Sequence, residues 1–491
     1  HDMGAAGLTS SSAEMAARGG VGVELETDKV PIRETGMTPY EIMLSESQER
    51  MLVVAEPHQV AAIQAVCEKW ELSATPIGRV TDDGLYRILH HGVIVAEIPG
   101  QRLIDDVPIY EPEAREDQRA KARRAAIPSG PPRADVRGAL LLLLDEPSIA
   151  SKRWVFEQYD STVQAATLLG PGGDAGVLRV GNTDFGLAVT VDCNSRLVAL
   201  DPFEGGKATV AEAARNIACT GALPLGITDC LNFGNPDRPE VFFQFREACR
   251  GIAQACRAFN TPVTGGNVSL YNESPSGAID PTPTVGMVGL LEQLAHRVPS
   301  HFQLAGDRIL ILGRSEGHLG GSAYWAHVRD LVGGHPPPVD LAAELALQQF
   351  LVAAARDRLL SSAHDCATGG LAVTLAEAAM GGPYASVGLG AEIDLSSYGI
   401  GIVCSTDPVD AALLYGEDQA RAVISVDPPR VGDVLTLARR FGVPALLVGT
   451  VGDPQGDVII ATPERHYTWA VEALRETYFG AIPRRMKGAG E

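Results

Sequence analysis

The stretch His1–Leu8 (HDMGAAGL) returns later in the chain as His364–Leu371 (HDCATGGL), at an offset of 363 residues. In both stretches a glutamate follows at the same distance, Glu14 in the first and Glu377 in the second. A long motif that recurs with its downstream acid indicates that a segment of the chain has been duplicated.

Two further matches extend the repeat. They pair Glu46–Arg50 with Glu417–Arg421 and Gly78–Asp82 with Gly449–Asp453, both at an offset of 371 residues. Three matches in the same order, with a drift of only eight residues, indicate one domain present twice. The period is far too long for a solenoid, so we expect two pseudo-symmetric copies, over residues 1–95 and 306–460.

The two copies differ in what precedes them. A different domain, over residues 151–305, leads into the second copy, whereas the first copy starts directly at its motif with His1. We therefore expect this chain to be the C-terminal part of a longer protein, with a processed or tagged N-terminus as the alternative. Residues 96–150, which include a stretch rich in Pro, Arg, Glu and Asp, are predicted to be a solvated linker, and residues 461–491 a helical tail.

Composition excludes some classes of function. The 491 residues are 45% hydrophobic and 21% charged, with a net charge of −21, which disfavours non-specific binding to nucleic acid or to anionic membranes. The longest purely aliphatic run, Ala139–Leu144, is too short to span a bilayer. The eight cysteines form no C-x-x-C pair or zinc-type array, which suits a reducing, cytoplasmic location.

Alternating helix and strand signals through the middle of the chain predict an α/β fold there. Helices are predicted over residues 8–17, 60–70, 210–219 and 241–259, and strands over 21–25, 51–54, 187–192, 225–228, 262–264, 284–290 and 308–312.

The densest functional signal lies in the middle domain, in two predicted loops at strand ends, Thr228–Pro236 (TDCLNFGNP) and Thr261–Asn272 (TPVTGGNVSLYN). A pair of glycines lets backbone N–H groups approach phosphate oxygens. Asp229 and Asn267 offer the oxygen ligands that Mg²⁺ prefers, and Ser269 can donate to a phosphate. The alternative is a pair of tight turns with side-chain caps, and the loop chemistry alone does not decide between the two.

A further glycine-rich run, Gly170–Gly176 (GPGGDAG), fits neither the P-loop nor the dinucleotide-binding pattern. A mobile flap over a nucleotide and a flexible surface loop are equally good interpretations of it.

The first copy carries polar residues of its own. Asp2 precedes a Gly/Ala turn and a predicted helix, where a carboxylate caps the helix or binds a metal. Glu46, Ser47 and Gln48 offer three polar side chains for orienting a hydroxyl-rich substrate. In the second copy Asp418 replaces Ser47, and the added negative charge disfavours an anionic ligand there.

Taken together, the motifs resemble those of the formylglycinamide ribonucleotide amidotransferase family, in its short form, the PurL synthetase subunit (phosphoribosylformylglycinamidine synthase). The matching stretches, which run in the family's order over nearly the whole chain, are HDMGAAGLTSSSAEMA, MTPYEIMLSESQERM, SIASKRWVFEQYD, ITDCLNFGNPDRPEVFFQFREA, TPVTGGNVSLYNE and HDCATGGLAVTLAEAA. The resemblance implies duplicated modules like aminoimidazole ribonucleotide synthetase (PurM-like), of mixed α/β and α+β class, related by pseudo-symmetry. Each module has an N-terminal-type and a C-terminal-type domain; residues 151–305 would be the former, and 1–95 and 306–460 the latter.

The resemblance also implies a reaction, in which ATP phosphorylates the formamide oxygen of formylglycinamide ribonucleotide and ammonia then displaces phosphate to give the amidine. ATP and Mg²⁺ are the implied cofactors. A glutaminase subunit would supply ammonia, bridged by a small third protein. The implied site residues are Asp229 and Gly266 for ATP, Asp2 and Asn267 for Mg²⁺, and Glu46, Ser47, Gln48 and Ser269 for the substrate.

The chain departs from the family at one point. The family's catalytic histidines lie in a leading domain that this sequence does not contain, and the corresponding strand here reads Asp192-Cys193-Asn194-Ser195-Arg196. We therefore nominate no general base and expect the chain alone to turn over little substrate. The alternatives are a non-catalytic nucleotide-binding or assembly fragment, and another synthetase of the same superfamily. Aminoimidazole ribonucleotide synthetase itself has one module, so the duplication argues against it.

Overall fold

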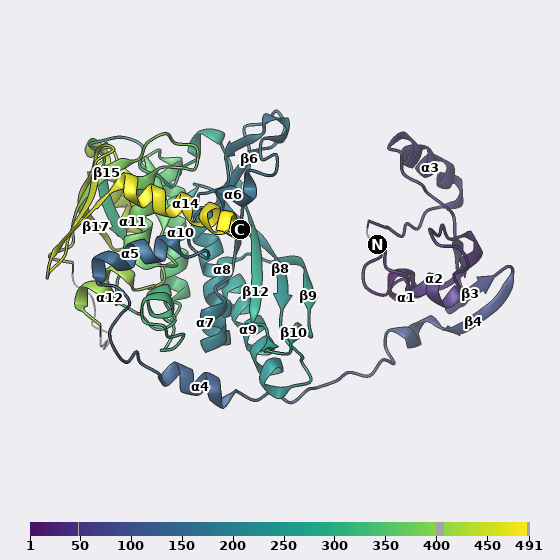
Figure 1. Ribbon diagram of the computed structural model, residues 1–491. Coiled ribbons are helices and arrows are strands. Elements are labelled where there is room, and N and C mark those ends of the chain that lie inside the picture. The colour runs from purple at the N-terminus through teal and green to yellow at the C-terminus, as the bar shows by residue number, and fades with distance from the viewer. Residues whose placement is uncertain (48, 399–406, 489–491) are drawn as a thin grey trace. The chain divides into compact units, whose positions relative to one another are not determined.

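The computed structural model describes residues 1–47, 49–398 and 407–488 (Figure 1). Gln48, one of the predicted substrate residues, lies outside the described residues. The chain forms two compact units, His1–Glu111 and Pro112–Glu491, and each is described by itself.

The first unit is built on a four-stranded sheet of order β2-β1-β3-β4, in which β1 runs parallel to β3. Leu8, Val23, Leu25 and Tyr86 are buried in its core. The predicted helix over 8–17 and strand over 21–25 are confirmed as α1 and β1, and the helix over 60–70 as α3. The elements are α1 (Gly7–Gly19), β1 (Gly22–Glu26), α2 (Pro39–Leu44), α3 (Val60–Lys69), β2 (Gly78–Thr81), β3 (Leu85–His90) and β4 (Val93–Pro99).

The predicted strand over residues 51–54 is wrong. Met51 forms only an isolated bridge with Asp2, and Val53 and Val54 are more than half exposed. The equivalent residues of the second copy form β16 (Ala422–Val426), which is buried between two neighbours, β13 and β14. The described residues of the first unit contain no counterpart of β13, so residues 51–54 have a backbone partner on one side only.

The second unit begins with a segment that the sequence predicts to be linker. Most of it is irregular around a short helix, α4 (Gln118–Ala125), but α5 (Val136–Asp145) lies in the core. Leu140, Leu143 and Leu144 are fully buried there. The aliphatic run is therefore a buried helix, and the segment is not wholly a solvated strap.

The middle of the chain forms a six-stranded sheet of order β5-β6-β7-β12-β8-β9. Helix α8 packs against β12 and β8, and α9 packs against α8 (Figure 1). Asp201 starts α8, since its carboxylate accepts hydrogen bonds from the amides of Phe203 and Glu204 and Pro202 opens the first turn. The elements are α6 (Arg153–Phe156), β5 (Thr167–Leu169), β6 (Gly176–Arg179), β7 (Gly186–Asp192), α7 (Ser195–Leu200), α8 (Pro202–Cys219), β8 (Leu223–Asn232), α9 (Pro239–Phe259), β9 (Val263–Ser269), β10 (Glu273–Ser274), β11 (Gly277–Ala278) and β12 (Thr282–Leu291).

The two motif segments were predicted to be loops, and much of each is strand instead. Residues 228–232 continue β8, and residues 263–269 form β9, which runs parallel to β8 at the sheet edge. Glycine and asparagine are poor strand formers, but pairing with an established neighbouring strand overrides that local preference.

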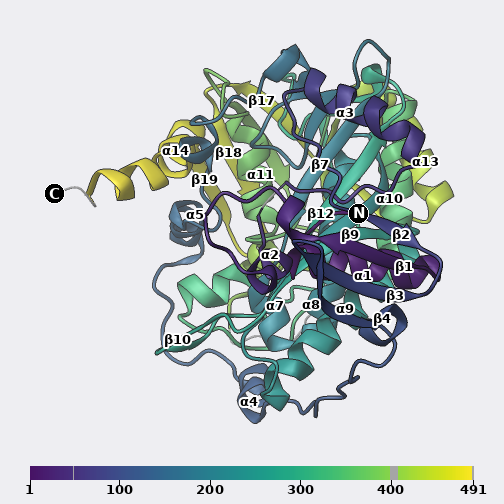
Figure 2. The ribbon, with the colours of Figure 1, turned by 90° about the vertical axis from the view of Figure 1, so that its right-hand side faces the viewer.

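The second copy is a seven-stranded sheet of order β14-β16-β13-β17-β15-β18-β19, which confirms the strand predicted over 308–312. Figure 2 shows α11 and α14 beside β18 and β19. The sheet continues to Ala470, beyond the predicted boundary at residue 460. The elements are β13 (Arg308–Leu312), a π-helix (Tyr324–Val328), α10 (Leu341–Arg356), β14 (Ser362–Asp365), α11 (Gly370–Met380), β15 (Leu389–Asp394), α12 (Val409–Tyr415), β16, α13 (Val431–Phe441), β17 (Ala445–Pro454), β18 (Asp457–Ala461), β19 (His466–Ala470) and α14 (Val471–Gly488).

No helix among the described residues has both the length and the apolar character needed to cross a bilayer.

Candidate functional site

The two motifs of the middle domain lie side by side on neighbouring strands. In the parallel register of β8 and β9, Asp229 is opposite Gly266 and Cys230 is opposite Asn267. Residues that are 37 positions apart in the sequence therefore form one polar strip at the exposed edge of the sheet. This juxtaposition is what a binding site built from both motifs requires.

Gly266 is required by the position of its neighbour. A Cβ added at Gly266 would lie 1.9 Å from Oδ1 of Asp229 and 2.8 Å from the Asp229 carbonyl oxygen. No side chain fits that space, so the Asp229 carboxylate lies directly over the Gly266 backbone. The pair forms a small cradle of one carboxylate and bare backbone, which suits close approach by a ligand.

The Asp229 carboxylate has no counter-charge among the described residues. Partial burial raises its pKa above the usual value of 3.8, because a charge removed from water without a partner is destabilised. A cation at this position would relieve that cost. The residues present therefore fit a divalent cation or the cation-bearing phosphates of a nucleotide.

Asn267 and Ser269 follow on the same edge strand. The Asn267 amide nitrogen lies 3.9 Å from Sγ of Cys230, an orientation that leaves its carbonyl oxygen available as a cation ligand. The Ser269 hydroxyl lies within hydrogen-bond distance of the side chain of Asn272, whose amide also donates to the Ser269 carbonyl oxygen at 2.9 Å. Ser269 is thus held by a turn that follows the strand.

The predicted residues of the first unit lie around the start of α1. One carboxylate oxygen of Glu46 accepts a hydrogen bond from the backbone amide of Ala6 at 2.7 Å, so Glu46 holds the turn that follows Asp2. Asp2 itself makes no capping bond to α1, and of its two predicted roles capping is not observed. The Ser47 carbonyl oxygen accepts from Nε of Arg50 at 3.2 Å, and its side chain is exposed.

The second copy repeats this geometry in buried form. Glu417 accepts from the backbone amide of Gly369 at 2.7 Å, and Arg421 donates from Nε to the carbonyl oxygen of Asp418 at 3.1 Å. Asp418 accepts from the amide of Gly317 at 3.0 Å and interacts with the His318 ring. Asp418, the acid that replaces Ser47, is therefore engaged in contacts within the protein.

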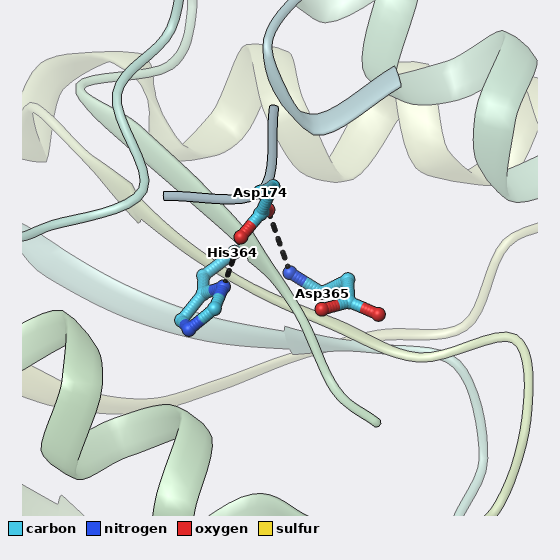
Figure 3. Close-up of side chains that lie close together, drawn as sticks. All are labelled: Asp174, His364 and Asp365. Carbon is cyan, nitrogen blue, oxygen red and sulfur yellow. Dashed lines mark hydrogen bonds and ion pairs between the residues drawn. The ribbon is translucent and has the colours of Figure 1, made fainter. Parts of the chain in front are cut away.

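The glycine-rich run 170–176 is attached to the second copy (Figure 3). One oxygen of Asp174 lies 2.5 Å from Nδ1 of His364, and the other accepts from the Asp365 amide at 3.1 Å. Burial alone would lower the pKa of His364, but the carboxylates of Asp174 and Glu377 raise it well above its usual value. Both Asp174 oxygens are occupied by these contacts, so Asp174 ties the glycine-rich run to the second copy, and the ligand atoms of Asp174, His364 and Asp365 lie within 4.8 Å of one another.

Next to Asp365 lies a buried group of charged side chains that the sequence analysis missed. Arg215 is fully buried and pairs with Glu344 at 2.5 Å and Asp365 at 3.5 Å. Burial raises the pKa of Asp192 to about 6 and that of Asp365 to about 7, with neighbouring carboxylates adding to both. The signal in the sequence is the polar set Glu212, Arg215 and Asn216 in the second half of α8, which periodicity alone does not distinguish from a solvated helix edge.

Comparison with known families matches this architecture domain by domain. The model for the AIR synthase related protein, N-terminal domain, matches residues 172–291, and the model for the C-terminal domain matches twice, over 1–91 and 305–462. The C-terminal-type matches cover slightly more than half of the chain, so the chain belongs to the AIR synthase related protein family. The predicted fold class, duplicated aminoimidazole ribonucleotide synthetase-like modules, is confirmed.

Within that family the chain is similar to PurL subunits, which confirms the resemblance drawn from the motifs. It is 50% identical over 452 residues to the phosphoribosylformylglycinamidine synthase subunit PurL of Moorella thermoacetica and 47% identical over 493 residues to that of Chlorobaculum tepidum. These matches cover 92% and 98% of this chain and 60% and 64% of the relatives. The chain thus spans a little under two thirds of the length of these relatives.

A solved structure supports the similarity to PurL subunits. Thermotoga maritima PurL complexed with AMPPCP is 25% identical and aligns with a TM-score of 0.62, over 92% of this chain and 64% of that one.

Proposed function

We propose that this chain contributes to the ATP-dependent amidation of formylglycinamide ribonucleotide, a step of purine biosynthesis that yields the formylglycinamidine ribonucleotide. The observation that carries the proposal is the cradle of Asp229 and Gly266 in a chain whose relatives are named for that synthase. The AMPPCP complex of the T. maritima protein supports a nucleotide as the ligand.

Each predicted residue has a role in this proposal. Asp229 and the bare backbone at Gly266 would contact ATP, with the carboxylate facing a cation that the phosphates carry. Asn267 and Asp2 would hold Mg²⁺, which when bound neutralises phosphate charge. Ser269, with Glu46, Ser47 and Gln48, would bind the ribonucleotide. No residue of the chain is assigned as general base.

Two of these assignments are refined by the contacts within each unit. The Glu46 carboxylate already accepts the Ala6 amide, so its part in substrate binding would be to hold the turn, with Ser47 presenting its exposed hydroxyl. Ser269, oriented by Asn272, would donate to a substrate oxygen.

The proposal extends to partners and location. A glutaminase subunit would deliver ammonia and a small bridging subunit would join the two, in the cytoplasm. The word subunit in the relatives' names supports an assembly of this kind.

Titration of the 491-residue chain with Mg·ATP tests the nucleotide part. We expect Gly266→Ala to abolish binding, because the new methyl displaces Asp229, and Asn267→Ala to weaken Mg²⁺-dependent binding by about tenfold, the effect of losing one ligand interaction. Asn235→Ala, on the loop that follows β8, is the control and should bind like the parent. Equal Mg·ATP affinity in all three variants would remove the cradle from the proposal.

The reaction itself is tested by supplying ATP, ammonia and formylglycinamide ribonucleotide and measuring ADP and amidine. Amidine formation with the chain, alone or with further parts of the synthase, supports catalysis. Mg·ATP binding with no turnover under both conditions would favour the non-catalytic binding role instead.

A further inference from the structure

A groove of about 540 Å³ runs along α9, outside the candidate site. Its floor is one face of the helix, from Phe242 through Ala253 to Arg257, and Phe203 of α8 forms a wall. We call it the α9 groove. None of the residues that line it belongs to the Asp229–Gly266 cradle.

The crossing of α8 and α9 creates the wall. A Cβ on Gly251 would lie 2.2 Å from the carbonyl oxygen of Phe203, and one on Gly206 would lie 2.4 Å from that of Ala248. The two backbones therefore touch, which brings the start of α8 against α9. Phe203 is held there beside the groove, with the guanidinium of Arg250 5.9 Å from its ring centre.

The rim of the groove is positively charged. Arg246 and Arg250 share a single carboxylate, Glu247, at 2.8 Å each. Arg257 has no ion pair among the described residues and is exposed. Three arginines thus face one acid, in a chain whose net charge is −21, so this patch contrasts with the rest of the molecule and attracts an acidic partner.

The dimensions and composition favour a protein partner over a small ligand. Phe242 and Arg257 are fifteen positions apart on α9, which corresponds to about 22 Å along the helix axis. That is the length of a four-turn helix and more than a mononucleotide fills. The lining contains phenylalanine and arginine and no lysine or acid, a composition typical of protein interfaces. The small side chain of Ala253, one turn before Arg257, permits close approach of another helix.

We propose that the α9 groove is the docking site of a partner subunit, which inserts an amphipathic helix with acidic residues along its edges. Its apolar stripe covers Phe242 and Ala253, and its acids pair with Arg246, Arg250 and Arg257. The identity of the partner, the glutaminase or the bridging subunit, rests on the proposed function; the location and chemistry of the groove do not.

The test uses the whole chain mixed with each purified subunit, the glutaminase and the bridging protein, with affinity measured by titration calorimetry and assembly by sedimentation. We expect Ala253→Arg to abolish the complex, and Arg257→Glu to weaken it by about tenfold or more, as for charge reversal at an interface. Raising the salt concentration should weaken the parent complex and not rescue Arg257→Glu. Arg440→Glu, an exposed arginine of α13, is the matched control and should bind like the parent, and circular dichroism checks that every variant is folded.

Three results would overturn the docking proposal. If the parent binds a subunit and both groove variants bind it equally well, the interface lies elsewhere, and the proposed function is untouched. If Arg440→Glu weakens binding as much as Arg257→Glu, the effect is one of net charge and the groove is not the site. If the parent binds neither subunit, the docking proposal and the partner assignment both fail, whereas the Mg·ATP titration still decides the nucleotide part separately.

Discussion

The two copies of the repeated domain keep the same internal contacts in opposite environments. Glu46 and Glu417 each accept a hydrogen bond at 2.7 Å from the backbone amide of the residue five positions after the first histidine of the motif, Ala6 or Gly369. A ring nitrogen of His1 lies 3.3 Å from Glu14, and one of His364 lies 3.2 Å from Glu377. The glutamates that hold the turn differ most, since Glu46 is exposed and Glu417 is buried, whereas His364 and Glu377 are part-buried.

The comparison shows that the shared motif has a structural role, since it holds the same turn in both copies. Gly7 and Gly370 adopt positive φ in both copies, and a Cβ at either would clash with a carbonyl oxygen of the equivalent turn, Ser45 or Gly416. The copies differ two residues after that turn. Ser47 is exposed in the first copy, whereas Asp418 at the equivalent position of the second copy is hydrogen-bonded inside the protein. Substrate binding is therefore proposed for the first copy, in which Ser47 is exposed.

The largest expected effect separates two equivalent arginines. Arg421 and Arg50 make the same backbone contacts, but Arg421 is 1% exposed and also bonds Ser315. We expect Arg421→Ala to lower the free energy of unfolding by about 3–5 kcal/mol, because Asp418 and buried carbonyl oxygens lose their partner. Arg50→Ala should cost about 1 kcal/mol, as for an ordinary hydrogen bond. Urea unfolding of both variants measures the difference, and equal losses would contradict the contrast between the copies.

A smaller effect is expected for the equivalent glutamates. Glu417→Ala leaves the amides of Gly369 and Ala323 without an acceptor inside the protein, and should cost about 2 kcal/mol or more. Glu46→Ala leaves the amide of Ala6 to water and should cost about 0.5 kcal/mol. Thermal unfolding compares the two. A larger loss in Glu46→Ala would show that burial is not what distinguishes the copies.

A third effect depends on pH and concerns the buried charges next to Asp365 of the second copy. The pKa of Asp192 is raised from 3.8 to about 6, so the folded protein keeps a proton that the unfolded chain releases. Its contribution to stability is present below pH 4 and is lost as the pH rises to about 6, by at most about 3 kcal/mol for a shift of this size. Asp192→Asn removes that dependence.

The measurement is the difference in unfolding free energy between parent and Asp192→Asn at several pH values. We expect the parent to lose stability relative to the variant between pH 4 and 6 and to change no further above that range. Asp237→Asn, an exposed acid of the same unit, is the control. A difference that stays constant with pH would remove Asp192 from the buried group.

Local patterns predicted the regular elements well. The helix α9 forms where the apolar positions from Val241 to Phe259 recur on one face, and β13 forms over the residues predicted for it. The errors occur where pairing overrides local preference. Asp229 and Gly266 looked like loop residues and lie in paired strands, whereas Met51–Val54 looked like a strand and lacks a neighbour on one side.

The sequence by itself determined the duplication, the family and the residue types of the candidate site, because a repeated motif and a long match do not depend on folding. Only the tertiary structure decided that Asp229 lies over Gly266, that Asp174 reaches His364, and that Arg215 is enclosed by acids. Those contacts join residues from 37 to 190 positions apart. These contacts result from strand register and burial, which no local sequence pattern contains. The same polar residue type occurs in the sequence whether its side chain faces water or a buried charge.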